Sequence, residues 1–219
     1  MESKNYRPDI DGLRAIAVFV VVAYHAGFSG FTGGYVGVDV FFIISGFLIT
    51  GMLYAEAENT GTISLEYFYA KRFKRLYPAL LFVIAITIVA WAIFFLGIPS
   101  KTLSFIKSIR YSIFGFANIF FKKNTGGYFD LASEEMPLLH FWSLAVEEQF
   151  YFLWPLLILI CSKIKFRYLI LKNKVLIALS ILVVTSFITS EYLILNNRSN
   201  EAFYYMHAPA WELGLGGLL

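Results

Sequence analysis

Long apolar segments limit the possible folds of this chain more than any other feature of its sequence. A helix needs about 20 apolar residues to cross a bilayer, and several segments of the 219-residue chain have this character. Backbone groups inside lipid must satisfy their own hydrogen bonds, which favours helices. We therefore predict an all-α, polytopic transmembrane helical bundle of about five to six helices. The predicted segments are 10–28, 36–54, 78–96, 140–161, 175–195 and one that starts near 208.

The composition agrees with a membrane protein. Hydrophobic residues make up 58% of the chain, against about 45–50% in a soluble domain, and the mean hydropathy is +0.67. The net charge of +3 is small, and the basic residues are clustered. This pattern indicates the lipid bilayer as a partner and no nucleic acid. We expect no metal site.

The segment 103–121 and the start of the third helix each need a separate interpretation. The segment 103–121 is long enough to span, but Lys107 and Arg110 lie in its middle. This favours an interfacial or re-entrant amphipathic helix. Pro78 is expected in the first turn of the third helix, where its missing N–H removes no helical hydrogen bond.

The positions of Lys and Arg predict the orientation, because basic loops stay in the cytoplasm. The clusters at 71–75 and 162–174 should be cytoplasmic, whereas the glycine-rich turn at 29–35 has no charge. The N-terminus is then cytoplasmic, and 97–139 stays on the outer side. Basic residues between 101 and 123 count against this assignment.

Two ionisable residues, Arg14 and His25, lie in the first apolar segment, eleven positions apart. On a helix they share nearly one face and stand about 16 Å apart. Ionisable groups inside a membrane are costly and commonly functional. His25 can take and return a proton near neutral pH, and Arg14 suits a phosphate or a carboxylate. Alternatively, each side chain only reaches the nearest membrane interface.

The fourth predicted helix opens with polar residues. His140, Glu147 and Tyr151 fall on one face, and Glu148 places a second carboxyl group in the apolar segment. Such carboxyl groups need partners or a proton, and Glu147 could hold a histidine in one tautomer. A glutamate pair in the headgroup region is the alternative. Tyr151 is expected to pack.

Arg72 and Arg75 are neighbours on a helix face. Near the cytoplasmic surface they could bind the phosphates of a soluble donor, or they could only anchor the chain or bind anionic lipid. Asp39 is expected to cap the second helix or to pair with His25. The glycines at 37, 46 and 51 predict close helix packing.

Five stretches resemble the acyltransferase-3 family of bacterial inner-membrane O-acyltransferases. They are 6–17 followed by His25, then 37–49, 72–78, 140–151 and 210–216. The resemblance implies transfer of an acyl group, usually acetyl, from cytoplasmic acyl-CoA to a hydroxyl group of a cell-envelope glycan. The acceptor could be lipopolysaccharide O-antigen, peptidoglycan or an exopolysaccharide.

The resemblance also assigns roles to residues of this chain. It makes His25 and Glu147 catalytic, with Glu147 orienting a histidine that acts as general base or, alternatively, as a transient acyl carrier. Acetyl-CoA would be bound by Arg14, Arg72 and Arg75. The residues expected to support the site are Asp39, His140, Ser143 and Glu148.

Family domains have more transmembrane helices than this chain, which ends inside its sixth. Residues 1–219 are therefore expected to form the N-terminal part of a membrane acyltransferase domain that continues beyond 219. A second polypeptide could instead supply the missing helices. The alternative functions are a transporter or proton relay, and an inactive fragment of the acyltransferase.

Overall fold

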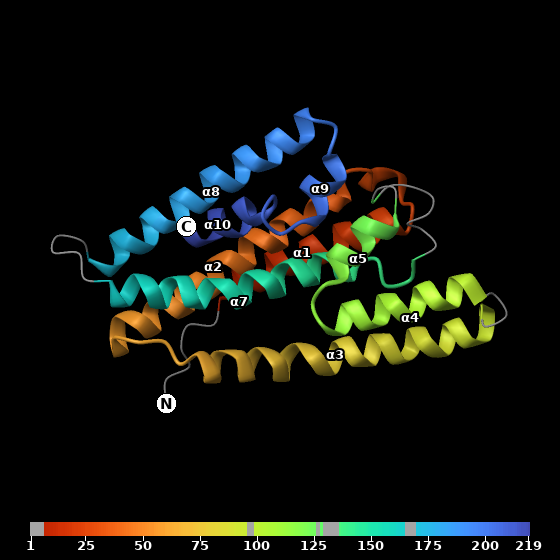
Figure 1. Cartoon of the computed structure of the whole chain (residues 1–219), viewed down its shortest axis with the longest axis horizontal. Helices are drawn as coiled ribbons and strands as arrows, with labels where there is room; N and C mark the ends of the chain where they lie inside the picture. Colours follow the sequence, from red (N-terminus) through yellow and green to blue (C-terminus); the bar gives the residue numbers. More distant parts are fainter. Residues whose placement is uncertain (1–6, 96–98, 126–127, 129–135, 165–169) are drawn as a thin grey trace.

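The computed structural model describes residues 7–95, 99–125, 128, 136–164 and 170–219, and these residues form helices joined by short turns (Figure 1). Within those ranges no strand occurs, as the all-α prediction requires. Two short 3-10 helices, η1 (Ser29–Phe31) and η2 (Gly34–Val36), join the first two long helices. The α-helices are α1 (Pro8–His25), α2 (Gly37–Thr60), α3 (Leu65–Phe94), α4 (Pro99–Ile113), α5 (Ala117–Asn124), α7 (Phe141–Lys163), α8 (Leu171–Leu195), α9 (Ser199–Tyr204) and α10 (Ala210–Leu218).

Four of the described helices are long and apolar enough to cross a membrane, namely α2, α3, α7 and α8. The predicted first span corresponds to α1, which begins with Asp9, Asp11 and Arg14 and is therefore less apolar than these four. The predicted sixth span corresponds to α10, which has 9 residues here. The chain is a helical membrane protein.

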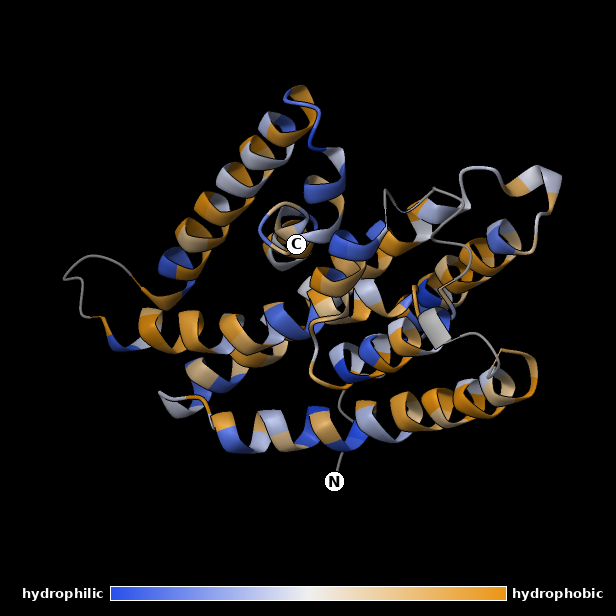
Figure 2. Ribbon diagram, turned by 45° about the vertical axis from the view of Figure 1, so that its right-hand side comes forward, coloured by the Kyte–Doolittle hydropathy of each residue, from blue (hydrophilic) through white to orange (hydrophobic). Residues whose placement is uncertain are grey.

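The third helix begins much earlier than predicted. It starts at Leu65, and the N–H group of Tyr67 donates to the hydroxyl of Ser64 at 3.4 Å, which caps the first turn. Pro78 therefore lies inside the helix, and its expected place in the first turn was wrong. The amphipathic stretch before Pro78 forms helix because it buries Phe68 against the core. Figure 2 shows this first half as mostly hydrophilic and the second half as hydrophobic.

The segment predicted as one helix over 103–121 is two helices, α4 and α5. The break contains Gly115, whose φ of +71° is a left-handed conformation that favours glycine. Neither helix is among the four that could span a membrane. The helix α4 lies beside the second half of α3 (Figure 1), where Phe105 stacks on Trp91 with ring centroids 4.5 Å apart.

Glycines allow α2 to approach its neighbours closely. A Cβ atom at Gly46 would overlap the carbonyl oxygen of Leu213 in α10, and one at Gly37 would overlap that of Ala17 in α1. Close packing is thus confirmed at these two positions. It was wrong for Gly51, where a Cβ would meet nothing within 4 Å.

The basic loop predicted over 162–174 lies partly outside the described residues, at 165–169. Lys174, on the described side of this gap, donates to the carbonyl oxygens of Cys161 at 3.3 Å and Ile164 at 2.6 Å. These bonds satisfy two carbonyl groups at the end of α7 and hold the start of α8 next to it.

Candidate active site

A cavity of about 470 Å³ opens between α1, α2, α3 and α7. Its walls are mostly apolar, as expected for a site within a helical bundle. Five of the residues that the sequence predicted for the site, and also Tyr151, contribute to its polar lining. The polar or charged lining side chains include Arg14, Ser45, Arg72, Arg75, Glu147, Glu148 and Tyr151.

Three arginines from two helices meet at this cavity. Arg14 comes from α1, and Arg72 and Arg75 come from consecutive turns of α3. The guanidinium of Arg72 lies over the ring of Tyr151, 5.0 Å from its centroid, which fixes its direction. Guanidinium groups bind phosphate and carboxylate oxygens through pairs of hydrogen bonds. The cavity therefore suits an anionic ligand with an apolar portion.

Glu147 faces this cavity, but its partners differ from the expected one. Its Oε1 accepts a hydrogen bond from the hydroxyl of Ser45 at 2.7 Å, and its Oε2 accepts one from the hydroxyl of Tyr151 at 3.4 Å. No described contact joins it to His25. The expectation that Glu147 orients His25 was therefore wrong for this arrangement. Tyr151, expected only to pack, connects Glu147 to Arg72.

His25 is the last residue of α1, and it makes two hydrogen bonds. Its Nδ1 lies 2.8 Å from the carbonyl oxygen of Val21, and its Nε2 lies 2.8 Å from the hydroxyl of Tyr128. His25 does not line the arginine cavity. Because α1 is continuous between Arg14 and His25, about 16 Å of helix separates them. The structure therefore has a cationic region, formed by Arg14, Arg72 and Arg75, and a separate histidine region around His25.

His140 belongs to the histidine region. It immediately precedes α7, and its ring contacts that of Phe141. Loss of hydration, and then repulsion from His25, lower the pKa of His140. Ser143 donates to the carbonyl oxygen of His140 at 3.2 Å and so supports the first turn of α7.

Asp39 neither caps α2 nor bonds to His25, so both expectations for it were wrong. Val36 occupies the N-cap position, and no side chain caps the helix there. The carboxyl of Asp39 instead contacts that of Glu212 in α10. Glu212 is 8% exposed, and among the described residues its Oε2 has no hydrogen-bond partner. Asp39 thus belongs to the contact between α2 and α10.

Glu148 lies at the edge of the cavity next to Gly115. A Cβ atom at Gly115 would come within 2.7 Å of a carboxylate oxygen of Glu148. The next residue, Gln149, donates to the carbonyl oxygen of Gly115 and to Oδ1 of Asn118, both at 2.9 Å. Asn118 in turn donates to the carbonyl oxygen of Tyr204 at 2.9 Å. These hydrogen bonds connect α5, α7 and α9 next to Glu148.

The sequence reasoning missed the roles of Ser45, Tyr128 and Gln149. Gln149 carried a usable signal, because a polar amide in an apolar helix needs a partner. Ser45 and Tyr128 carried none, since each meets its partner about a hundred positions away. Within the described residues, no group of three or more His, Cys, Asp or Glu side chains could hold a metal ion.

Comparison with known proteins gives this arrangement a context. The family model described as "Acyltransferase domain" (Acyl_transf_3) matches residues 7–219. The chain belongs to the acyltransferase-3 family. No solved structure matches this acyltransferase domain.

Two relatives of this acyltransferase domain are named as O-acetyltransferases. The peptidoglycan O-acetyltransferase OatA of Listeria monocytogenes is 41% identical over 165 residues, which cover 74% of the chain and 25% of the relative. The O-acetyltransferase OatA of Staphylococcus aureus is 39% identical over 194 residues, covering 87% of the chain and 32% of the relative. The chain therefore spans about a third or less of their length.

Proposed function

We propose that this chain is part of an O-acyltransferase that moves an acyl group, normally acetyl, from acyl-CoA to a hydroxyl group of a cell-envelope glycan. The observation that carries the proposal is the meeting of Arg14, Arg72 and Arg75 at one cavity in an otherwise apolar bundle. The name of the Listeria monocytogenes relative favours peptidoglycan as the glycan.

The donor half of the reaction belongs to the arginine cavity. Coenzyme A carries several phosphate groups, which the three guanidinium groups can bind. Its pantetheine arm is flexible and only weakly polar, which suits the mostly apolar walls of the cavity. In this proposal Glu147 positions Tyr151, and the ring of Tyr151 holds Arg72 in the direction of the phosphates.

The acceptor half belongs to His25. Its Nε2 can accept the proton of a sugar hydroxyl while the hydroxyl oxygen attacks the thioester carbon. An oxygen–carbon bond then forms, the carbon–sulfur bond breaks, and the coenzyme leaves as a thiol with a proton returned by the histidine. The separation of about 16 Å between Arg14 and His25 is of the order of a pantetheine arm.

The orientation follows from these two halves. Acyl-CoA is a cytoplasmic metabolite, so we place the arginine cavity and the N-terminus on the cytoplasmic side of the bacterial inner membrane. His25 and the turn after α1 then lie toward the outer side, where the glycan is. Helices beyond residue 219, or on a second polypeptide, would complete the site.

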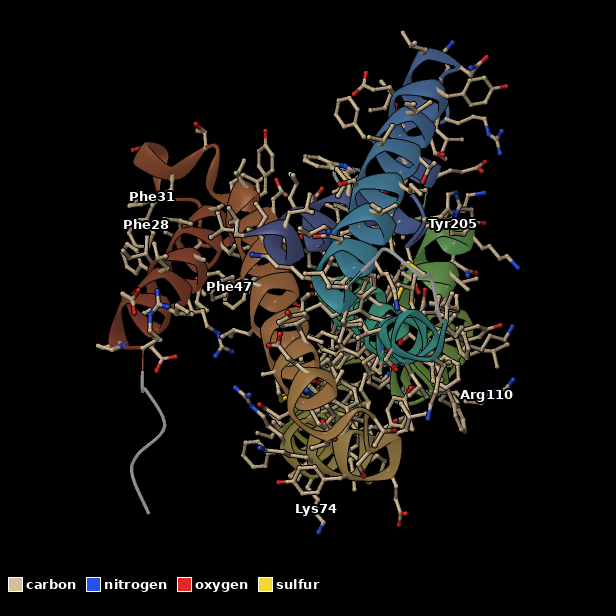
Figure 3. The ribbon with its side chains drawn as sticks, turned by 90° about the vertical axis from the view of Figure 1, so that its left-hand side faces the viewer. Phe28, Phe31, Phe47, Lys74, Arg110 and Tyr205 are labelled. Carbon is tan, nitrogen blue, oxygen red and sulfur yellow. The ribbon has the colours of Figure 1, made fainter. Side chains whose placement is uncertain are left out.

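The test uses membranes that contain the full protein and labelled acetyl-CoA, with label measured in the glycan. Arg72→Ala removes charge-assisted hydrogen bonds and should raise the KM for acetyl-CoA about 10- to 100-fold. The matched control is Lys74→Ala, because Lys74 is on the same helix and points away from the other helices (Figure 3). His25→Ala should abolish transfer.

Two results would overturn the proposal. Undiminished glycan labelling by the His25→Ala variant would remove the histidine from the reaction. A complete absence of covalent label with the unaltered protein would instead agree with a transporter or an inactive fragment.

A further inference from the structure

The hydrogen bonds of His25 determine which ring nitrogen is free for chemistry. The carbonyl oxygen of Val21 can only accept, so Nδ1, 2.8 Å away, must carry a proton and donate it. In a neutral imidazole the other nitrogen, Nε2, then has the lone pair. That lone pair points to the hydroxyl of Tyr128, 2.8 Å away.

The hydroxyl of Tyr128 is the donor in its hydrogen bond with neutral His25. In a neutral imidazole that donates through Nδ1, Nε2 carries no proton and can only accept. The hydroxyl proton of Tyr128 is therefore directed to Nε2 of His25. Burial raises the pKa of Tyr128, so this proton stays in place at neutral pH. The hydroxyl is thus a donor to neutral His25.

Aromatic rings hold Tyr128 in this position. Its ring centroid lies 4.9 Å from that of Phe203 in α9 and 5.8 Å from that of Trp142 in α7. The rings of Trp142 and Phe203 also contact each other, at 4.2 Å. Trp142 is buried in the core, so the position of Tyr128 is tied to the bundle.

A general base must lie about 2.6–3.2 Å from the hydroxyl oxygen whose proton it takes. The hydroxyl of Tyr128 already has this geometry relative to Nε2 of His25. One lone pair cannot accept two protons, so a sugar hydroxyl and the hydroxyl of Tyr128 cannot both occupy this position.

We propose that the hydroxyl of Tyr128 holds the place of the acceptor hydroxyl at Nε2 of His25, and that a sugar hydroxyl must displace it before transfer. This inference rests on the proposed function of His25 as the base. Nε2 of neutral His25 accepts one proton at this position, and a sugar hydroxyl can supply that proton as the hydroxyl of Tyr128 does. The partly exposed ring of Phe203, which packs on Tyr128, offers an apolar face of the kind that sugar rings contact.

The first test compares Tyr128→Phe with the unaltered protein in detergent, using labelled acetyl-CoA and a peptidoglycan oligosaccharide as acceptor. Removing the hydroxyl keeps the aromatic ring and frees Nε2. The KM for the acceptor should fall about two- to tenfold, the factor that one neutral hydrogen bond contributes, while kcat and the KM for acetyl-CoA stay unchanged. Tyr192→Phe, at an exposed position of α8, is the matched control.

The second test does not require transfer. Diethyl pyrocarbonate modifies the unprotonated nitrogen of histidine, and mass spectrometry of peptides gives the rate at each residue. In Tyr128→Phe the rate at His25 should rise by a similar factor, with the exposed His207 as internal reference.

The outcomes separate this inference from the proposed function. An unchanged modification rate at His25, a raised acceptor KM, or a lower kcat in Tyr128→Phe would overturn the inference while leaving His25 as the base. If the unaltered protein transfers no label at all, the proposed function fails first, and the inference fails with it.

Discussion

Two identical substitutions on α2 should have opposite effects on stability. Gly46 and Gly51 lie in the same helix, one turn and a half apart, and neither has a positive φ. A Cβ atom at Gly46 would overlap the carbonyl oxygen of Leu213, whereas one at Gly51 would meet nothing within 4 Å. Gly46→Ala should therefore force α10 away from α2, and Gly51→Ala should fit without movement.

The two variants share one energy term and differ in another. Replacing glycine by alanine inside a helix favours the helix by about 0.5–1 kcal/mol, and this gain is common to both. Overpacking in a close contact costs about 1–3 kcal/mol, and it applies only to Gly46→Ala. The free energies of unfolding should therefore differ by about 1–3 kcal/mol, with Gly51→Ala equal to or above the unaltered protein.

The assay is thermal unfolding of the detergent-solubilised protein, followed by tryptophan fluorescence. For a chain of this size, 1 kcal/mol corresponds to about 2–4 °C in Tm, so the two variants should differ by about 2–12 °C. Gly216→Ala, which would overlap the carbonyl oxygen of Ile43 from the α10 side, should resemble Gly46→Ala. Equal Tm values for Gly46→Ala and Gly51→Ala would refute the close contact of α10 with α2.

Gln149→Leu should lower the free energy of unfolding by about 1–3 kcal/mol, because it leaves the carbonyl of Gly115 and the amide oxygen of Asn118 without their donor. Chemical unfolding in mixed micelles measures this, and a neutral result would mean that water replaces the amide. The pKa of Glu201 is lowered, first by the hydrogen bond from Arg198. A carboxylate with a lowered pKa stabilises the fold above its ordinary pKa of about 4.3 and loses this effect as the pH falls through the folded value. The unaltered protein should thus exceed Glu201→Gln in Tm at pH 7 and lose that advantage below about pH 4; a constant difference between pH 7 and pH 3 would contradict the ion pair.

The sequence predicted the helical fold better than it predicted the contacts between the helices. The apolar segments correctly located the long helices, and the arginines at 14, 72 and 75 do line one cavity. Helical spacing alone brings two of these arginines together, since Arg72 and Arg75 must share a face of α3. The early start of α3 was missed because its first turns are polar, and only the burial of Phe68 and the Ser64 cap make them helical.

The partners of the ionisable groups could not be predicted in the same way. Glu147 was expected beside His25, and it bonds instead to Ser45 and Tyr151. The contact with Ser45 depends on how far α2 is shifted and rotated relative to α7, whereas Tyr151 lies one turn away in the same helix. Periodicity within a helix specifies which face a residue occupies, but it does not specify which residue of a neighbouring helix lies opposite.

By itself, the sequence determined that this chain is a helical membrane protein of the acyltransferase-3 family, because long apolar segments and ordered motifs are local properties of the chain. Only the tertiary structure decided that Glu147 bonds to Ser45 and that the hydroxyl of Tyr128 bonds to Nε2 of His25. The physical reason is that these contacts join residues about a hundred positions apart. Their geometry is set by close packing between helices, which glycines such as Gly46 permit.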